Sequence, residues 1–118
     1  MAWQYNQRTG ELSQNGRCVA GGYSGAGVGR NNPAMETLPY VGPIPRGSYR
    51  IGLPHQGHRT GPHVMDLTPV GHTAHRRTDL QIHADNPKNA ASTGCIVLPP
   101  DVRRQISNSG DNVLEVVQ

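Results

Sequence analysis

The amino-acid sequence predicts a mainly β domain with one short α-helix. Its 118 residues include 15 glycines and 10 prolines, a composition that favours short strands joined by tight turns over a helical bundle. Aromatic residues make up only 4% of the chain and phenylalanine is missing, so aliphatic side chains must fill the core. Start and stop signals of a helix occur together once, between residues 99 and 110. At this length a single domain, 1–118, is expected.

The first strands are predicted from alternation and from turn residues. Residues 3–6 alternate between apolar and polar and indicate a strand. Residues 11–13 and 17–20 flank an Asn-Gly dipeptide at 15–16, which is the strongest short signal of a β-hairpin. Glycine and asparagine then dominate residues 21–39, and this composition predicts a long surface loop.

The second half is expected to add four strands and the helix. A rigid proline turn at 42–47 precedes them. The helix begins at Pro99-Pro100-Asp101, because a proline and an early acidic residue suit a first turn, and Gly110 ends it. The four strands are expected at 48–51, 63–68, 78–83 and 112–117.

Charge and hydropathy exclude several classes of function. Eleven basic and eight acidic residues give a net charge of +3, and the basic residues are scattered, so nucleic acid is not an expected partner. The longest apolar run, 95–100, is far too short to cross a membrane. The N-terminus has neither a basic nor an apolar region, so no signal peptide is expected.

The segment from His83 to Cys95 holds the most chemical information. A thiol is a weak nucleophile until it ionises, so a catalytic cysteine needs a base beside it. Histidine is suited to that role near neutral pH. A glycine directly before Cys95 permits a tight bend, which would aim the N–H groups of Gly94 and Cys95 at one point, as an oxyanion requires.

Other interpretations are compatible with the same residues. Cys95 could be a buried small hydrophobic residue, or it could form a disulfide with Cys18. His72 and Asp79 have the H-x6-D spacing found in one class of zinc peptidoglycan peptidases, and His83 could supply a third ligand. A cell-wall-binding domain without catalytic activity is a further alternative.

The motifs resemble those of a known family. A His at 83, a loop and then Ser-Thr-Gly-Cys at 92–95 resemble the active-site motif of YkuD-type L,D-transpeptidases, and the turn at 42–47 with Ser48-Tyr49 resembles a turn of the same fold. Nearly the whole chain is similar to the L,D-transpeptidase-like effectors that bacterial type VI secretion systems deliver. The shared motifs are a Trp/Tyr-rich first strand, Gly-Tyr-Ser-Gly and Asn-Asn-Pro within 22–33, the proline turn, Ile-His at 82–83, Ser-x-Gly-Cys-Ile at 92–96, an Arg-bearing helix and Gly-Asp-Asn at 110–112.

The resemblance implies a small YkuD-like β-sandwich or barrel, with a short helix after a catalytic cysteine, that acts on peptidoglycan stem tetrapeptides without a cofactor. Cys95 would attack the carbonyl of the third-position diamino acid and expel the terminal D-Ala. His83 would act as base, with its tautomer fixed by the Ala84 carbonyl, and the N–H groups of Gly94 and Cys95 would hold the oxyanion. Water as acceptor gives an L,D-carboxypeptidase, a free D-amino acid gives exchange, and a second stem gives a 3→3 crosslink.

Five residues are expected to support substrate binding: Ser92, Thr93, Tyr23, Asn32 and Arg103. Ser92 and Thr93 could equally order the turn, and a solvated charge on the helix is the favoured interpretation of Arg103. Most cell-wall L,D-transpeptidases carry a histidine where this chain has Thr93, which leaves His83 as the candidate base. Cys18 is expected to pack in the hairpin.

The resemblance also implies where the protein acts and with what. The expected partners are peptidoglycan stem peptides and a cognate immunity protein that occludes the cleft near Cys95. Secretion without a signal peptide, by a type VI system, would place the protein in the periplasm of a target bacterium. There the loss or exchange of D-Ala would deprive the recipient's crosslinking enzymes of substrate.

Overall fold

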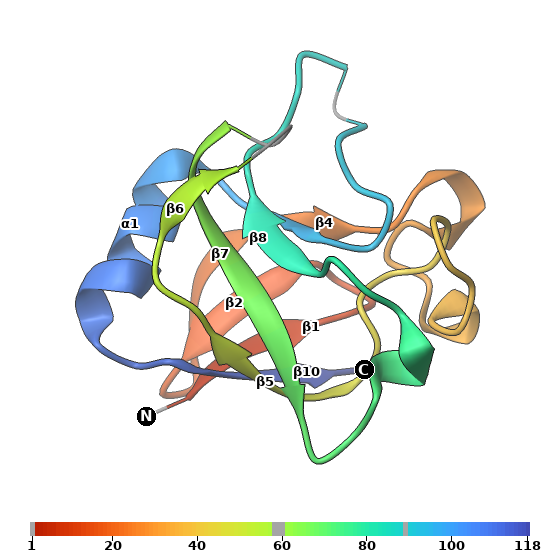
Figure 1. The fold of residues 1–118 in the computed structure, drawn as a ribbon, viewed down its shortest axis with the longest axis horizontal. Helices are drawn as coiled ribbons and strands as arrows, with labels where there is room; N and C mark the ends of the chain where they lie inside the picture. Colours follow the sequence, from red (N-terminus) through yellow and green to blue (C-terminus); the bar gives the residue numbers. More distant parts are fainter. Residues whose placement is uncertain (1, 58–60, 89) are drawn as a thin grey trace.

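The computed structural model describes residues 2–57, 61–88 and 90–118, and it has the predicted mainly β architecture (Figure 1). Within these residues there are ten strands, three 3-10 turns and one α-helix. The elements are β1 (Trp3–Asn6), β2 (Glu11–Gln14), β3 (Arg17–Gly21), β4 (Tyr23–Ser24), η1 (Gly27–Gly29), η2 (Pro33–Met35), β5 (Gly47–Ile51), β6 (His55–Gly57), β7 (Gly61–Val70), η3 (Ala74–Arg76), β8 (Gln81–His83), β9 (Ile96–Val97), α1 (Pro100–Ser109) and β10 (Val113–Val117).

The strands form one open, mixed sheet. They are hydrogen-bonded in the order β3-β2-β1-β10-β5-β7-β8-β9-β4, and β6 pairs with β7 outside this path. Two neighbouring pairs are parallel, β1 with β10 and β8 with β9, whereas the other pairs are antiparallel. The first parallel pair joins the two ends of the chain, and the second sets the strand that carries His83 beside the strand that follows Cys95.

One hydrophobic core lies between the two ends of the curved sheet. Trp3 from β1 belongs to the same buried cluster as Ile82 of β8 and Ile96 of β9. Helix α1 packs near β7 (Figure 1), and its buried residues Val102 and Ile106 belong to the same cluster. Full burial of an aliphatic side chain of this size contributes about 1.5–3 kcal/mol, so this shared core fixes the outer strands relative to each other.

Two predicted segments differ from the structure. Residues 21–39 were expected to be a loop, but β4 pairs antiparallel with β9, and η1 and η2 follow it. Tertiary pairing therefore overrides a composition that favours loops. The strand expected at 78–83 begins only at Gln81, because Asp79 has a φ of +57°, which is incompatible with an extended strand.

A left-handed turn precedes that strand. Ala74, His75 and Arg76 have φ values of +51°, +52° and +63°, and Asp79 follows with +57°. Left-handed conformation costs about 1–2 kcal/mol at a residue other than glycine, and it normally occurs at single positions. Such strain persists only where surrounding contacts determine it. The contacts of this segment therefore bear on the site described next.

Candidate active site

His83 and Cys95 lie on one face of the sheet. In the parallel pair β8–β9, Ile82 is opposite Ile96, and both side chains are fully buried in the core. Because side chains alternate along a strand, the neighbouring residues His83 and Cys95 face the other side. There they line one cleft of about 790 Å³. The remaining residues that line it are Pro39, Tyr40, Arg76, Arg77, Thr78, Asp79, Leu80, Gln81, Ala91, Thr93 and Gly94.

The imidazole of His83 is oriented by the main chain. Its Nδ1 lies 2.7 Å from the carbonyl oxygen of Ala84, so Nδ1–H donates and Nε2 is left as the acceptor. Burial lowers the pKa of His83 below its usual value and the Arg103 charge lowers it further, against the opposing hydrogen bond to Ala84 and the charge of Asp85. At neutral pH this histidine is therefore a neutral base with Nε2 free of a proton.

Cys95 is a protonated thiol. Burial raises its pKa to about 11, although a hydrogen bond with the Gln81 backbone and the charge of Arg77 oppose the rise. The carboxylates of Asp79 and Asp66 raise the pKa further. Among the described residues, the thiol donates to the Asp79 carbonyl at 3.3 Å rather than to the His83 ring. Transfer of its proton to His83 therefore requires the thiol to turn away from Asp79.

Alkylation of Cys95 by iodoacetamide should accelerate steadily as the pH rises. The thiolate is the reacting form, and with a pKa of about 11 its fraction grows about tenfold per pH unit between pH 7 and 9. Intact-mass spectrometry of a Cys18→Ser protein follows this single thiol. A rate that already reaches its plateau near pH 7 would contradict a protonated ground state.

Two buried serine hydroxyls hold the turn before Cys95. Ser92 Oγ accepts hydrogen bonds from Gly94 N–H at 3.1 Å and Gly25 N–H at 2.9 Å, and it donates to the Cys95 carbonyl at 2.6 Å. Ser24 Oγ donates to the Gly94 carbonyl at 3.0 Å and accepts from Ile44 N–H at 2.8 Å. Ser92 therefore orders the turn, which was one of its two expected roles. The contribution of Ser24 was not expected, because its partners Gly94 and Ile44 are far from it in the sequence.

One expectation about the oxyanion site does not hold in this structure. The N–H groups of Gly94 and Cys95 were expected to point freely at one position. The Gly94 N–H is instead engaged by Ser92 Oγ, so this group is already satisfied. Gly94 contributes its conformation, since its φ is +145° and an added Cβ would lie 2.2 Å from Arg77 Nη2.

Replacing Ser92 with alanine should lower the free energy of unfolding by about 2–3 kcal/mol. The change leaves two buried N–H groups, of Gly25 and Gly94, without their acceptor. Urea denaturation at neutral pH measures the loss, and Ser13→Ala on strand β2 is the matched control. Equal stability of both variants would mean that water replaces the hydroxyl at the turn.

The other expected substrate-binding residues fall into different places. Thr93 lines the Cys95 cleft. Tyr23 instead donates to the Asp85 carboxylate and accepts from Ala91 N–H at 2.8 Å, and so it anchors the chain that follows His83. Asn32 accepts from Ala34 N–H at 3.2 Å as the cap of η2, and it lines a separate hollow of about 560 Å³. Asn32 therefore does not line the Cys95 cleft, and its expected contact with substrate stays a prediction.

Arg103 is not a solvated helix charge. Only 3% of it is exposed, and it donates to the carbonyls of Leu98 at 2.6 Å and His63 at 3.2 Å. It lines a cavity of about 550 Å³ beside Tyr23 and Ala84, rather than the cleft of Cys95. Its charge reaches the site through space, where it lowers the pKa of His83.

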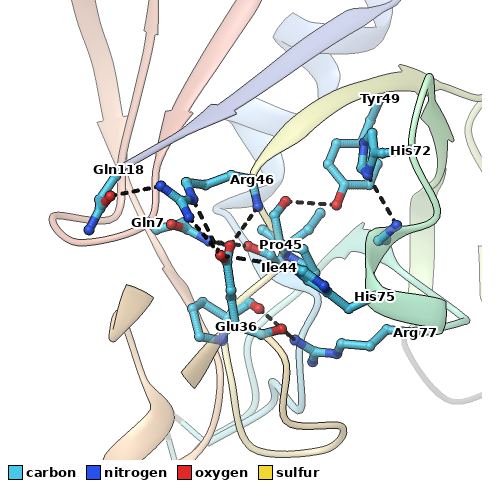
Figure 2. A network of polar contacts seen from close by, with 12 residues as sticks. Gln7, Glu36, Ile44, Pro45, Arg46, Tyr49, His72, His75, Arg77 and Gln118 are labelled. Atoms are coloured by element: carbon cyan, nitrogen blue, oxygen red, sulfur yellow. Dashed lines mark hydrogen bonds and ion pairs between the residues drawn. The ribbon is translucent and has the colours of Figure 1, made fainter. Parts of the chain in front are cut away.

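The zinc ligand set is not assembled. His72 Nε2 donates to the Ser48 carbonyl at 2.9 Å, its Nδ1 accepts from Ala74 N–H at 3.0 Å, and its ring packs edge-on against Tyr49 (Figure 2). Within residues 2–57, 61–88 and 90–118, no three His, Cys, Asp or Glu side chains are grouped as a metal site requires. Both ring nitrogens of His72 are thus used by the fold.

The two cysteines are also free, so the structure does not contain the alternative disulfide. Cys18 lies exposed in the hairpin strand β3.

Arg77 is a site residue that sequence analysis missed. It is 8% exposed and donates to four main-chain carbonyls, those of Glu36, Gly42, Pro43 and Thr93. Figure 2 shows its guanidinium beside Glu36, below the network around that residue. In the sequence Arg77 is only half of a basic doublet, and a role that depends on distant carbonyls leaves no local pattern.

Glu36 is the centre of that network. Its carboxylate accepts from Gln7 Nε2 and the Arg46 N–H, at 2.8 and 2.9 Å, and it forms an ion pair with the Arg46 guanidinium at 3.0 Å (Figure 2). Gln7 also donates to the Ile44 carbonyl at 2.8 Å. The network therefore joins β1 to the proline turn that Arg77 contacts from the other side.

The chain is similar to known proteins in its sequence, through a family model, and in its fold, through a solved structure. A family model described as the Tlde1 domain matches residues 19–117. Among solved structures, the crystal structure of Mycobacterium tuberculosis L,D-transpeptidase 1 is similar, with a TM-score of 0.54 and 18% sequence identity over 99% of this chain. This chain spans 61% of that protein's chain, and at such an identity the likeness concerns the fold. No curated protein matches by sequence. The L,D-transpeptidase-like fold expected from the motifs is thereby confirmed.

Proposed function

The chain belongs to the Tlde1 domain family, the L,D-transpeptidase-like effectors of type VI secretion, and from this premise we propose that it is a cysteine enzyme that acts on peptidoglycan. Its substrates would be stem tetrapeptides, and the bond that it cleaves would be the L,D bond between the third-position diamino acid and the terminal D-Ala. The observation that carries the proposal is that His83 and Cys95 line one cleft, with Nδ1 of His83 held by the Ala84 carbonyl. A neutral imidazole beside a protonated thiol is the starting state of a cysteine acyl transfer.

The proposed reaction begins with proton transfer from Cys95 Sγ to His83 Nε2. The thiolate attacks the carbonyl carbon of the diamino acid, and the C–N bond to D-Ala then breaks. His83 returns the proton to the leaving amine, and a thioester to Cys95 remains. Water, a free D-amino acid or the side-chain amine of a second stem then attacks the thioester, which gives hydrolysis, exchange or a crosslink.

The oxyanion is assigned to the Cys95 N–H. The neighbouring Gly94 N–H donates to Ser92 Oγ, so it would join only by leaving that hydroxyl. Preorganised main-chain donors stabilise a tetrahedral oxyanion by several kcal/mol, and the loss of a single donor already slows the reaction. Thr93 lines the cleft directly before this turn and would contact the substrate there.

The proposed site of action is the periplasm of a target bacterium, after delivery by a type VI secretion system. Family membership supports this placement. A cognate immunity protein that covers the Cys95 cleft belongs to the same proposal. Among the described residues there is no helix of the length and apolarity that a membrane span needs.

Incubation with a disaccharide-tetrapeptide, with and without an added D-amino acid, tests the proposal. Mass spectrometry should show loss of D-Ala in water and its replacement in the presence of the D-amino acid. The balance between these products identifies the acceptor. Unchanged masses, together with retention of the protein by isolated sacculi, would instead establish a wall-binding domain.

A further inference from the structure

Arg77 occupies an unusual place in the chain. It directly follows three consecutive left-handed residues, Ala74, His75 and Arg76, and Asp79 with its left-handed φ lies two residues further on. The Asp79 carbonyl is the acceptor of the Cys95 thiol. Backbone strain on both sides of one side chain indicates that its position is determined by contacts elsewhere.

The contacts of Arg77 converge on the turn before Cys95. Nη1 donates to the carbonyls of Glu36 at 2.9 Å and Pro43 at 2.6 Å. Nη2 donates to the carbonyls of Gly42 at 3.0 Å and Thr93 at 3.1 Å. One guanidinium thus ties two separate loops together, the connection between η2 and β5 and the loop that presents the thiol.

The guanidinium also packs directly on Gly94. A Cβ placed there would lie 2.2 Å from Nη2, so the close approach requires glycine. All four acceptors are neutral carbonyls, so Arg77 forms no ion pair through these contacts, although the Glu36 charge acts on it through space. That charge acts on Cys95 in the direction that favours the thiolate.

We propose that Arg77 is a positioning residue for the proposed reaction: it fixes the Thr93–Cys95 turn, and its charge stabilises the Cys95 thiolate that forms when His83 accepts the proton. The proposal rests on the proposed function for the reaction itself. Its effect on the thiol can be measured without any substrate.

The test compares Arg77→Gln with Arg77→Lys in a Cys18→Ser protein. Glutamine keeps an amide donor but removes the charge, whereas lysine keeps the charge and loses the planar fork. Arg50→Gln, which removes one charge from an exposed position of β5, is the matched control. The readout is the iodoacetamide alkylation rate of Cys95 from pH 7 to 10, with circular dichroism as the check on folding.

Arg77→Gln should slow alkylation about tenfold at each pH, whereas Arg50→Gln and Arg77→Lys should stay within about twofold of the parent protein. In the tetrapeptide assay both Arg77 variants should lose kcat with little change in KM, because the turn geometry is altered in both. A folded Arg77→Gln protein that is alkylated at the parent rate would overturn the proposal. If glutamine prevents folding, parent-like alkylation and kcat of Arg77→Lys would also overturn it, because the fork geometry would then be dispensable.

The two readouts separate this inference from the proposed function. If Arg77→Gln slows alkylation but the parent protein does not turn over stem peptides, the effect of Arg77 on the thiol stands and the proposed substrate is rejected. If the parent protein turns over stem peptides but Arg77→Gln does not slow alkylation, the proposed function stands and the role of Arg77 is rejected.

Discussion

Replacing Cys95 with alanine should abolish the loss or exchange of D-Ala from stem tetrapeptides while the fold stays intact. The proposed thioester cannot form without sulfur, and removal of a covalent nucleophile lowers turnover about a thousandfold or more. Among the described residues the contacts of the thiol are with main-chain groups, the Asp79 carbonyl and the Gln81 backbone, so its loss should change stability little. Mass spectrometry of the products and urea denaturation together measure both effects.

The matched control is Cys18→Ala, since Cys18 is the other free thiol and lies exposed in β3. It should retain full activity. His83→Ala should lose activity nearly as completely as the Cys95 variant, because the thiol with a pKa of about 11 then lacks the imidazole that the proposed reaction uses as its base. Full activity of Cys95→Ala, with sensitivity to chelators instead, would reject the thiol mechanism.

The residues of the site differ in how far the sequence predicts them. His83 and Cys95 carry chemistry in their side chains and stand at a recognisable spacing, so a motif reveals them. Arg77 and Ser24 act on main-chain carbonyls of distant segments, and any residue type can provide a carbonyl. No local pattern therefore reveals what either of them contacts: Arg77 is one half of a basic doublet, and the Gly-Tyr-Ser-Gly motif that contains Ser24 marks the family and not this contact.

The fold shows the same division. The hairpin β2–β3 follows from an Asn-Gly turn, which is a local signal, and the structure has it at the predicted place. Strand β4 is two residues long within a segment rich in glycine, and only its pairing with β9 makes it a strand. The left-handed conformation of Ala74 and Arg76 is likewise not predicted by their residue types, since neither favours it.

Replacing Glu36 with alanine should lower the free energy of unfolding by about 3 kcal/mol at pH 7. The change removes the acceptor of Gln7 and of the Arg46 backbone, and it breaks the ion pair with Arg46, whose side chain is half exposed and therefore adds little to the loss. Burial alone would raise the pKa of Glu36, but the hydrogen bonds from Arg46 and Gln7 and the Arg46 charge outweigh it and lower the pKa. A lowered pKa in the folded state stabilises the fold above the unfolded-state pKa, and this stabilisation is lost as the pH falls through the folded-state value.

Glu36→Gln separates charge from shape in this network. It should resemble the alanine variant at pH 7, and the difference from the parent protein should shrink as the pH falls through the lowered folded-state pKa of Glu36 and the parent carboxylate takes up its proton. Urea midpoints at pH 7 and pH 3 measure this change, and a gap of equal size at both would assign the effect to packing.

Because the Glu36 carbonyl also accepts from Arg77, loosening this loop should reach the turn before Cys95. Turnover by Glu36→Ala should therefore fall at a urea concentration well below its unfolding midpoint, whereas the parent protein keeps its activity there.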